Sequence, residues 1–268
     1  MVDVGSGPPV ILIPGVQGRW EWMQPAVEAL AKRCRVITFS LAGDRGSGRR
    51  FDPAWGFENY MDQIDDVMTT ARLSDAAICG VSFGGLIALH WAIHRSPRTR
   101  ALVLVSTPPP DFKPNRRLQW YMRAPRLLSV AFAAQSPFRL CPEMWPPFDR
   151  VGDRLGFAAK HLARVTTAPF SPPRMAERGA LLATADFDAA CNKVVAPTLV
   201  VTGETHLDRI VPVAGTKAYA SRIQGARHET LERTGHLGLV TRPGRFAELV
   251  GAFVWQHAAT VATERRSA

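Results

Sequence analysis

Residues 79–88 read CGVSFGGLIA, and this stretch places one serine, Ser82, among three glycines. It lies where an apolar run, residues 76–79, gives way to a run with helical spacing over residues 83–95. A glycine-rich turn between a strand and a helix can bind a phosphate, can expose a serine as a nucleophile, or can be an ordinary tight turn. The rest of the chain is needed to distinguish these three interpretations of the turn.

Short apolar runs alternate with longer segments of helical spacing along most of the chain. The apolar runs predict buried strands, at residues 10–13, 35–39, 76–79, 101–105, 197–202 and 227–231. The segments of helical spacing predict helices, at residues 22–33, 59–72, 83–95, 213–222 and 243–256. This alternation predicts an α/β fold with a mostly parallel central sheet flanked by helices.

The alternation is interrupted by one long segment that begins at Thr107-Pro-Pro-Pro110. Residues 107–185 are rich in arginine, proline and aromatic side chains, and their apolar spacing is helical. We interpret them as a helical cap inserted at the carboxyl ends of the strands, where α/β sheets bind ligands. The predicted core domain then comprises residues 1–106 and 186–268.

Of the three functions of the glycine-rich turn, the spacing favours a nucleophile. A dinucleotide-binding turn needs Gly-x-Gly, and Ser82 stands where the second glycine would be. A P-loop needs Gly-Lys-Ser/Thr, which does not follow. In a nucleophile elbow, small residues two before and two after the serine let strand and helix approach closely, and Gly80 and Gly84 meet that requirement.

A serine hydroxyl needs a base to become a nucleophile, and the base needs an orienting carboxylate. On this type of sheet they follow in the order serine, acid, histidine. Asp208 comes after the strand at residues 197–202, and His236 comes after the short strand at residues 227–231. All three side chains are therefore predicted at the carboxyl ends of strands, which is far more specific than the elbow alone.

With these motifs the sequence resembles the α/β-hydrolase fold superfamily, in its single-domain form with an inserted helical cap. The similarity covers nearly the whole chain, through Pro-Pro-Val-Ile-Leu-Ile-Pro-Gly, Gly-Val-Ser-Phe-Gly-Gly, Asp-Arg-Ile-Val-Pro and Gly-His-Leu-Gly. The resemblance implies Ser82 as nucleophile, Asp208 as orienting acid and His236 as general base. It also implies an oxyanion hole from the backbone N–H groups of Val16 and Phe83, with no metal or organic cofactor.

The chain departs from this family's usual pattern in three places. Pro14 stands where relatives usually have histidine. The loop from Gly203 to Asp208 is longer than usual by about two residues, which makes Glu204 an alternative acid. The antiparallel hairpin that usually precedes the first parallel strand is mostly missing, so we expect fewer than the usual eight strands.

The serine nucleophile predicts hydrolysis of carboxylic esters with small to medium acyl chains through an acyl-enzyme. One alternative is an ester or thioester hydrolase that acts on an acidic acyl carrier protein, because residues 107–185 hold 12 basic and five acidic side chains, +7 of the net +10. The arginines whose spacing fits one cap helix are Arg116, Arg117, Arg123 and Arg126. C–C hydrolysis, perhydrolysis and ligand reception also occur on this fold and stay open.

The remaining features bear on the substrate and on partners. Some cap aromatics are expected to meet the site, among Trp120, Tyr121, Phe132, Phe138, Trp145, Phe148 and Phe157. No nucleic-acid-binding motif is found, and no apolar run approaches the ~18 residues of a membrane span. The N-terminus has no signal-peptide pattern and the four cysteines are scattered, so we expect a cytoplasmic protein acting on a small-molecule ester.

Overall fold

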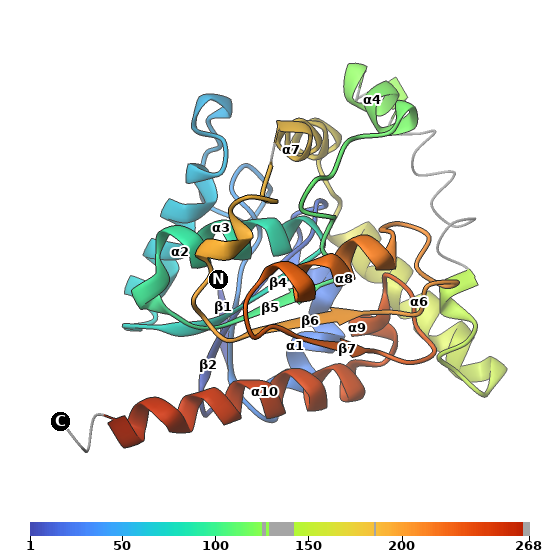
Figure 1. Ribbon diagram of the computed structural model, residues 1–268. Helices are drawn as coiled ribbons and strands as arrows, with labels where there is room; N and C mark the ends of the chain where they lie inside the picture. The colour runs from blue at the N-terminus through green and yellow to red at the C-terminus, as the bar shows by residue number, and fades with distance from the viewer. Residues whose placement is uncertain (125–126, 129–141, 185, 265–268) are drawn as a thin grey trace.

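A computed structural model describes residues 1–124, 127–128, 142–184 and 186–264, and it contains one seven-stranded sheet (Figure 1). The strands are β1 (Val2–Val4), β2 (Pro9–Ile13), β3 (Arg35–Thr38), β4 (Ala76–Val81), β5 (Thr99–Val105), β6 (Thr198–Thr202) and β7 (Arg227–Thr230). They lie in the order β1-β3-β2-β4-β5-β6-β7, with β1 antiparallel to β3 and every other pair parallel. The predicted α/β fold with a mostly parallel sheet is thereby confirmed, and the described residues form fewer than eight strands, as expected.

Helices cover both faces of the sheet. The helices α1 (Gln24–Leu30), α9 (Gly238–Thr241) and α10 (Pro243–Glu264) pack on one face, and α2 (Glu58–Thr70), α3 (Phe83–His94) and α8 (Val213–Arg222) pack on the other. Short 3₁₀ helices cover Trp20–Met23, Pro53–Trp55, Ser96–Arg98 and Cys191–Lys193. None of the described helices combines the length and the hydrophobicity that a membrane crossing requires.

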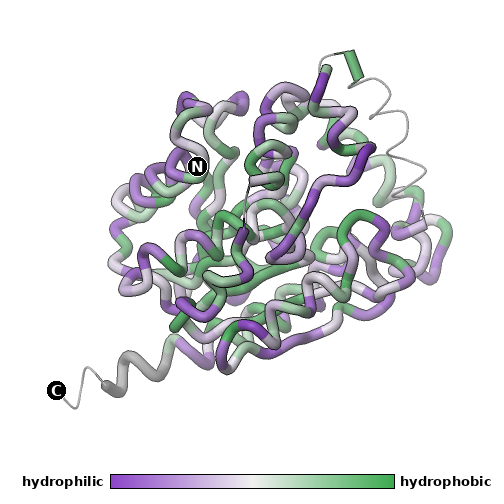
Figure 2. The backbone as a smooth tube through the Cα atoms, turned by 45° about the horizontal axis from the view of Figure 1, so that its top comes forward, coloured by the Kyte–Doolittle hydropathy of each residue, from purple (hydrophilic) through white to green (hydrophobic). Residues whose placement is uncertain are grey.

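The apolar run of β2 shows why the strands are hydrophobic throughout. Val10 and Leu12 contribute to the core on the α1 and α10 side, whereas Ile11 and Ile13 contribute to the core on the α2 and α3 side. Successive side chains of a strand point to opposite faces, so a strand covered on both faces has no polar side. Figure 2 agrees with this, because the hydrophobic stretches of the backbone tube lie mainly in the middle of the molecule.

The segment between β5 and β6 is helical, as its spacing predicts. It forms α4 (Arg116–Arg123), α6 (Val151–Thr167) and α7 (Pro172–Thr184), and α4 packs against α7 above the sheet in the view of Figure 1. The division of the chain into core and cap domains stays a prediction. Three of the residues singled out in this segment lie outside the described residues, namely Arg126, Phe132 and Phe138.

The strand order creates a switch point beside β2. The chain passes from β2 to β3 on one side, and then β4 pairs with β2 on its other side. Loops that leave the two central strands therefore diverge, and α/β sheets bind ligands in the crevice that such loops leave at the carboxyl ends of the strands. The loop after β2 contains Val16, and the turn after β4 contains Ser82.

Candidate active site

Ser82 has a strained backbone at the junction of β4 and α3. Its φ is 54° and its ψ is −121°, outside the usual regions for a residue with a side chain. A Cβ at Gly80 would collide with the carbonyl oxygen of Gly84, and one at Gly84 would collide with the carbonyl oxygens of β2 and the loop after it. The tight strand-to-helix approach predicted for a nucleophile elbow is therefore present.

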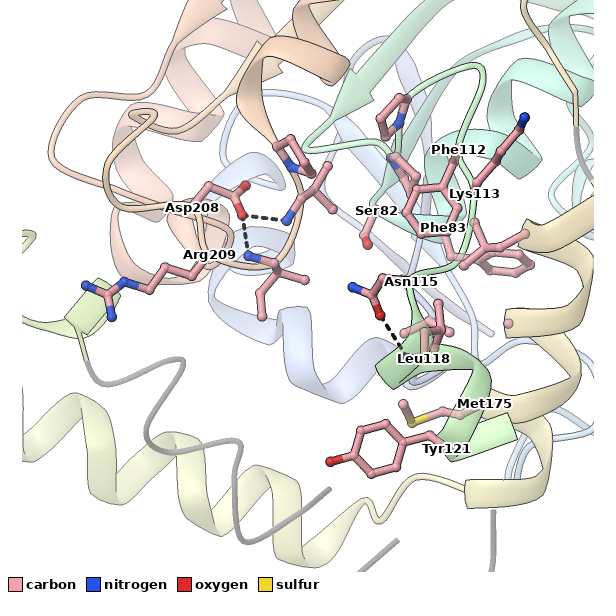
Figure 3. Close-up of a pocket in the computed structure, with 18 of the residues that line it drawn as sticks. Ser82, Phe83, Phe112, Lys113, Asn115, Leu118, Tyr121, Met175, Asp208 and Arg209 are labelled. Atoms are coloured by element: carbon pink, nitrogen blue, oxygen red, sulfur yellow. Dashed lines mark hydrogen bonds between the residues drawn. The ribbon is translucent and has the colours of Figure 1, made fainter. Parts of the chain in front are cut away.

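A cavity of about 660 Å³ opens beside Ser82 (Figure 3). Ser82, Phe83, Val16 and Asp208 all line it, although they come from three separate loops. The helical segment between β5 and β6 contributes much of the remaining wall, which includes Phe112, Lys113, Asn115, Leu118, Tyr121, Met175 and Leu182. The volume lies within the range of ordinary small-molecule sites.

Asp208 is held with one oxygen on the backbone and the other toward a histidine. Its Oδ1 accepts the backbone N–H groups of Ile210 at 3.0 Å and Val211 at 2.9 Å, drawn as dashed lines in Figure 3. Its Oδ2 lies 3.3 Å from His236 Nδ1. Burial alone would raise the pKa of this carboxyl, but His236 and the hydrogen bonds hold the pKa below its usual value. Asp208 therefore stays ionised and can orient His236.

Glu204, the alternative acid, faces other groups. Its Oε1 accepts the backbone N–H of Arg233 at 2.6 Å, and its Oε2 lies 3.5 Å from Nε2 of the exposed His206. The backbone oxygen of Glu204 accepts the N–H of Asp208 at 3.0 Å, which shapes the loop that carries Asp208. This geometry favours Asp208 over Glu204 as the partner of His236.

Val16 and Phe83, whose N–H groups are predicted to form an oxyanion hole, line the same cavity as Ser82. Phe83 is the first residue of α3, so its N–H has no acceptor within the helix. The loop after β2 passes directly beside Ser82, since a Cβ placed on Gly15 would lie 3.4 Å from the Ser82 Cβ. Pro14 thus occupies the usual histidine position without moving this loop away from the serine.

A buried arginine ties α7 to the loop that carries Val16. Arg178, with 1% of its side chain exposed, forms an ion pair with the equally buried Asp44. It also donates to the Val16 carbonyl oxygen at 3.0 Å, the Ala42 carbonyl oxygen at 3.2 Å and the Tyr60 hydroxyl at 3.2 Å. The position of the predicted oxyanion loop therefore depends on a residue outside the predicted core domain.

Replacing Arg178 with methionine is expected to lower the free energy of unfolding by about 3–5 kcal/mol, because it leaves Asp44 buried without its partner. Urea unfolding of the variant measures this loss. The double variant Asp44→Leu, Arg178→Met removes both charges and should recover most of it. The matched control is Arg222→Met at the more exposed pair with Asp188, where a loss below about 1 kcal/mol is expected. Equal losses at Arg178 and Arg222 would contradict a structural role for the buried pair.

Two functional candidates were not found from sequence. One is Arg178, and the other is Glu143, a fully buried acid whose carboxylate accepts N–H groups of the loops that carry Asp208 and His236. Among the aromatic residues singled out between residues 107 and 185, Tyr121 lines the cavity, while Trp120 and Trp145 are exposed. Neither Arg178 nor Glu143 lies in a recognisable motif. For Glu143, the sequence signal that could have drawn attention to it is that acidic residues are scarce in this basic segment.

With the geometry in place, comparison with known proteins identifies the family. A model of the "Alpha/beta hydrolase family" matches residues 10–249. The chain therefore belongs to the α/β-hydrolase family, and hydrolase is the activity class that its relatives support.

Individual relatives match along most of their length. The 2-hydroxymuconate semialdehyde hydrolase of Pseudomonas sp. (strain CF600) is 29% identical, over 94% of this chain and 88% of the relative. The poly(3-hydroxyalkanoate) depolymerase of Ectopseudomonas oleovorans is 26% identical, over 92% and 84%. The crystal structure of the enol-lactonase from Burkholderia xenovorans LB400 superposes with a TM-score of 0.76 at 21% identity, over 94% and 95%. At that identity the structural match shows the fold alone.

Proposed function

We propose that the protein hydrolyses carboxylic esters of small to medium acyl chains with a Ser82-His236-Asp208 triad. The observation that carries this proposal is the strained Ser82 at the wall of a largely apolar cavity that also includes Asp208, the hydrogen-bond partner of His236. Acyl transfer needs an accessible serine, a base and an acid that orients the base, and these three residues supply that set of groups.

The proposed reaction proceeds through two acyl transfers. Ser82 Oγ attacks the ester carbonyl carbon while His236 accepts the hydroxyl proton, and Asp208 stabilises the resulting imidazolium. The N–H groups of Val16 and Phe83 stabilise the negative charge on the carbonyl oxygen. His236 then protonates the departing alcohol, which leaves an ester of the acid on Ser82. A water molecule, deprotonated by His236, attacks that ester, and the acid and the serine are released.

The cavity suggests the acyl group. Phe112, Leu118, Met175 and Leu182 give it hydrophobic walls, and each CH₂ group that such walls bury is worth about 0.8 kcal/mol. We therefore expect affinity for an acyl chain to rise with its length until the cavity is filled.

The test is a panel of p-nitrophenyl esters, from acetate through butyrate and octanoate to dodecanoate. We expect the highest kcat/KM at butyrate or octanoate. Met175→Trp, which narrows the cavity, should move that maximum toward acetate, because Met175 lies on its wall. The matched control Leu162→Trp alters an exposed side chain of α6 and should leave the profile unchanged. Hydrolysis of none of these esters would contradict the proposed function.

A second candidate is hydrolysis of esters or thioesters carried on an acidic acyl carrier protein. The observation that favours it is α4, which places Leu118 and Tyr121 on the cavity wall while Arg116 and Arg123 on the same helix are exposed. Adding carrier-bound thioesters to the panel distinguishes the two candidates. Turnover of the carrier-bound substrate that falls steeply with added salt favours the carrier protein, since salt screens contacts between exposed charges.

Other chemistry on this fold would give a different result in the same panel. Reaction of Ser82 with a fluorophosphonate, without turnover of any ester or thioester, would favour C–C hydrolysis, perhydrolysis or ligand reception. The relative named for 2-hydroxymuconate semialdehyde makes a semialdehyde the natural further substrate to include.

A further inference from the structure

Glu143 is a buried acid that contacts both loops of the proposed acid–base pair. It lies between β5 and β6, and its side chain is 0% exposed. Its Oε2 accepts the backbone N–H of Leu237 at 3.1 Å, and its Oε1 accepts the backbone N–H of Arg209 at 3.4 Å. Leu237 directly follows His236, and Arg209 directly follows Asp208. One carboxylate therefore links the two loops whose side chains must stay aligned with each other.

The packing around Glu143 is equally specific. A Cβ placed on Gly235 would lie 2.7 Å from Glu143 Cδ and 2.6 Å from the Leu207 carbonyl oxygen. Only glycine leaves room for the carboxylate at the position before His236. The glycine before His236 therefore has two local reasons in this chain, which are the close approach of the Leu207 backbone oxygen and that of the Glu143 carboxylate.

The charge of Glu143 is coupled to the same pair of residues. The pKa of Glu143 lies above its usual value, because burial and the charge of Asp208 raise it more than the charge of His236 and the two N–H groups lower it. In its ionised form Glu143 favours the imidazolium that forms when His236 accepts the serine proton. It does so from outside the hydrogen bond between His236 and Asp208.

We propose that Glu143 is a positioning residue, which bridges the Asp208 and His236 loops and holds the imidazole in its working direction. This role rests on the proposed serine hydrolase function. Because the carboxylate comes from the helical segment that walls the cavity, the segment that contacts the substrate also fixes the acid–base pair. The Arg178 contact with the loop of Val16 is a separate tie between the same segment and the site.

Glu143→Gln tests this role, since it keeps the size and one acceptor oxygen but loses the charge and the second acceptor. With p-nitrophenyl butyrate we expect kcat to fall about 10- to 100-fold, because hydrogen bonds to a charged group are lost. KM should change less than about threefold, because Glu143 does not touch the substrate. The rate at which a fluorophosphonate labels Ser82 should fall in parallel with kcat.

Two further readouts separate positioning from packing alone. The acid limb of the kcat/KM profile should move to lower pH in Glu143→Gln, because the negative charge that favours the imidazolium is gone. Packing alone leaves this limb in place. Glu143→Leu, which fills the space without acceptors, should lose at least as much kcat as the glutamine variant. The control Asp153→Asn, an exposed acid of α6, should match the wild type.

The outcomes distinguish this role from the proposed function. A folded Glu143→Gln variant with wild-type kcat, pH profile and labelling rate would overturn the role of Glu143 while the wild type remains an active esterase. If only Glu143→Leu folds, wild-type kcat and labelling rate in that variant would likewise overturn the role of Glu143. A wild type that neither hydrolyses the ester nor reacts with the fluorophosphonate would overturn the proposed function, and the role of Glu143 with it.

Discussion

Replacing Ser82 with alanine is expected to reduce kcat for p-nitrophenyl butyrate by about 10⁴- to 10⁶-fold, because no acyl-enzyme can then form. The cavity wall and the N–H groups of Val16 and Phe83 remain, so KM should change little. Steady-state kinetics measures both values, and fluorophosphonate labelling of the variant should disappear. An alanine variant as active as the wild type would eliminate Ser82 as the nucleophile.

A neighbouring serine provides the control for this substitution. Ser106 follows β5, is buried, and also has a positive φ, of 42°, but it is not among the residues of the cavity wall. Ser106→Ala should therefore keep nearly full activity. Ser82→Gly should be at least as stable as the wild type, because glycine relieves backbone strain worth about 1–3 kcal/mol. Lost activity without lost stability is the combination expected of a strained functional residue.

The sequence predicted the sheet because each parallel strand is covered on both faces and is therefore hydrophobic throughout. The run Val10 to Ile13 illustrates this, since alternate residues enter opposite cores and none can be polar. The strand β1 has no such signal, because it has three residues, lies at the edge and is partly exposed. Its pairing with β3 is a tertiary contact that a local pattern does not contain.

For the site, the sequence yields a specific hypothesis that stays a prediction. Ser82, Asp208 and His236 follow strands in a fixed order, and the topology brings such positions to one edge of the sheet. The structure adds the contact between Asp208 and His236 and places Ser82 with Asp208 on one cavity. These positions could be proposed from the sequence because each lies in a segment that directly follows a predicted strand.

Glu143 and Arg178 were missed for the opposite reason. Both lie in the long segment between β5 and β6, where charged residues are usually solvated and the apolar spacing indicates only helices. Their burial results from pairing with groups 66 to 162 positions away along the chain, such as the N–H of Arg209 and the carbonyl oxygen of Val16. Periodicity and motif spacing are local, so they carry no information about such partners.

Asp208→Asn is expected to reduce kcat by about 10⁴-fold, equivalent to about 5 kcal/mol of transition-state stabilisation. The asparagine oxygen can still accept the N–H groups of Ile210 and Val211, so the loop and the stability of the protein should be kept. Its amide nitrogen then faces His236 Nδ1 and favours the wrong tautomer of the imidazole. Kinetics with an activated ester and a thermal melt measure the two effects separately.

Glu204→Gln provides the matched comparison, since it removes the other acid of the same loop. The Glu204 carboxylate accepts the Arg233 N–H and lies near His206, and a glutamine oxygen can still accept that N–H. We expect a change in kcat of less than about threefold, because the Glu204 carboxylate contacts Arg233 and His206 rather than His236. A larger loss in Glu204→Gln than in Asp208→Asn would transfer the orienting role to Glu204.

The carboxylates of Asp208 and Glu204 differ in how they are held. Asp208 has one oxygen fixed by two backbone N–H groups while its other oxygen faces His236. A general base that must point at Ser82 throughout two acyl transfers needs such a fixed partner, and a carboxylate held toward Arg233 does not supply it.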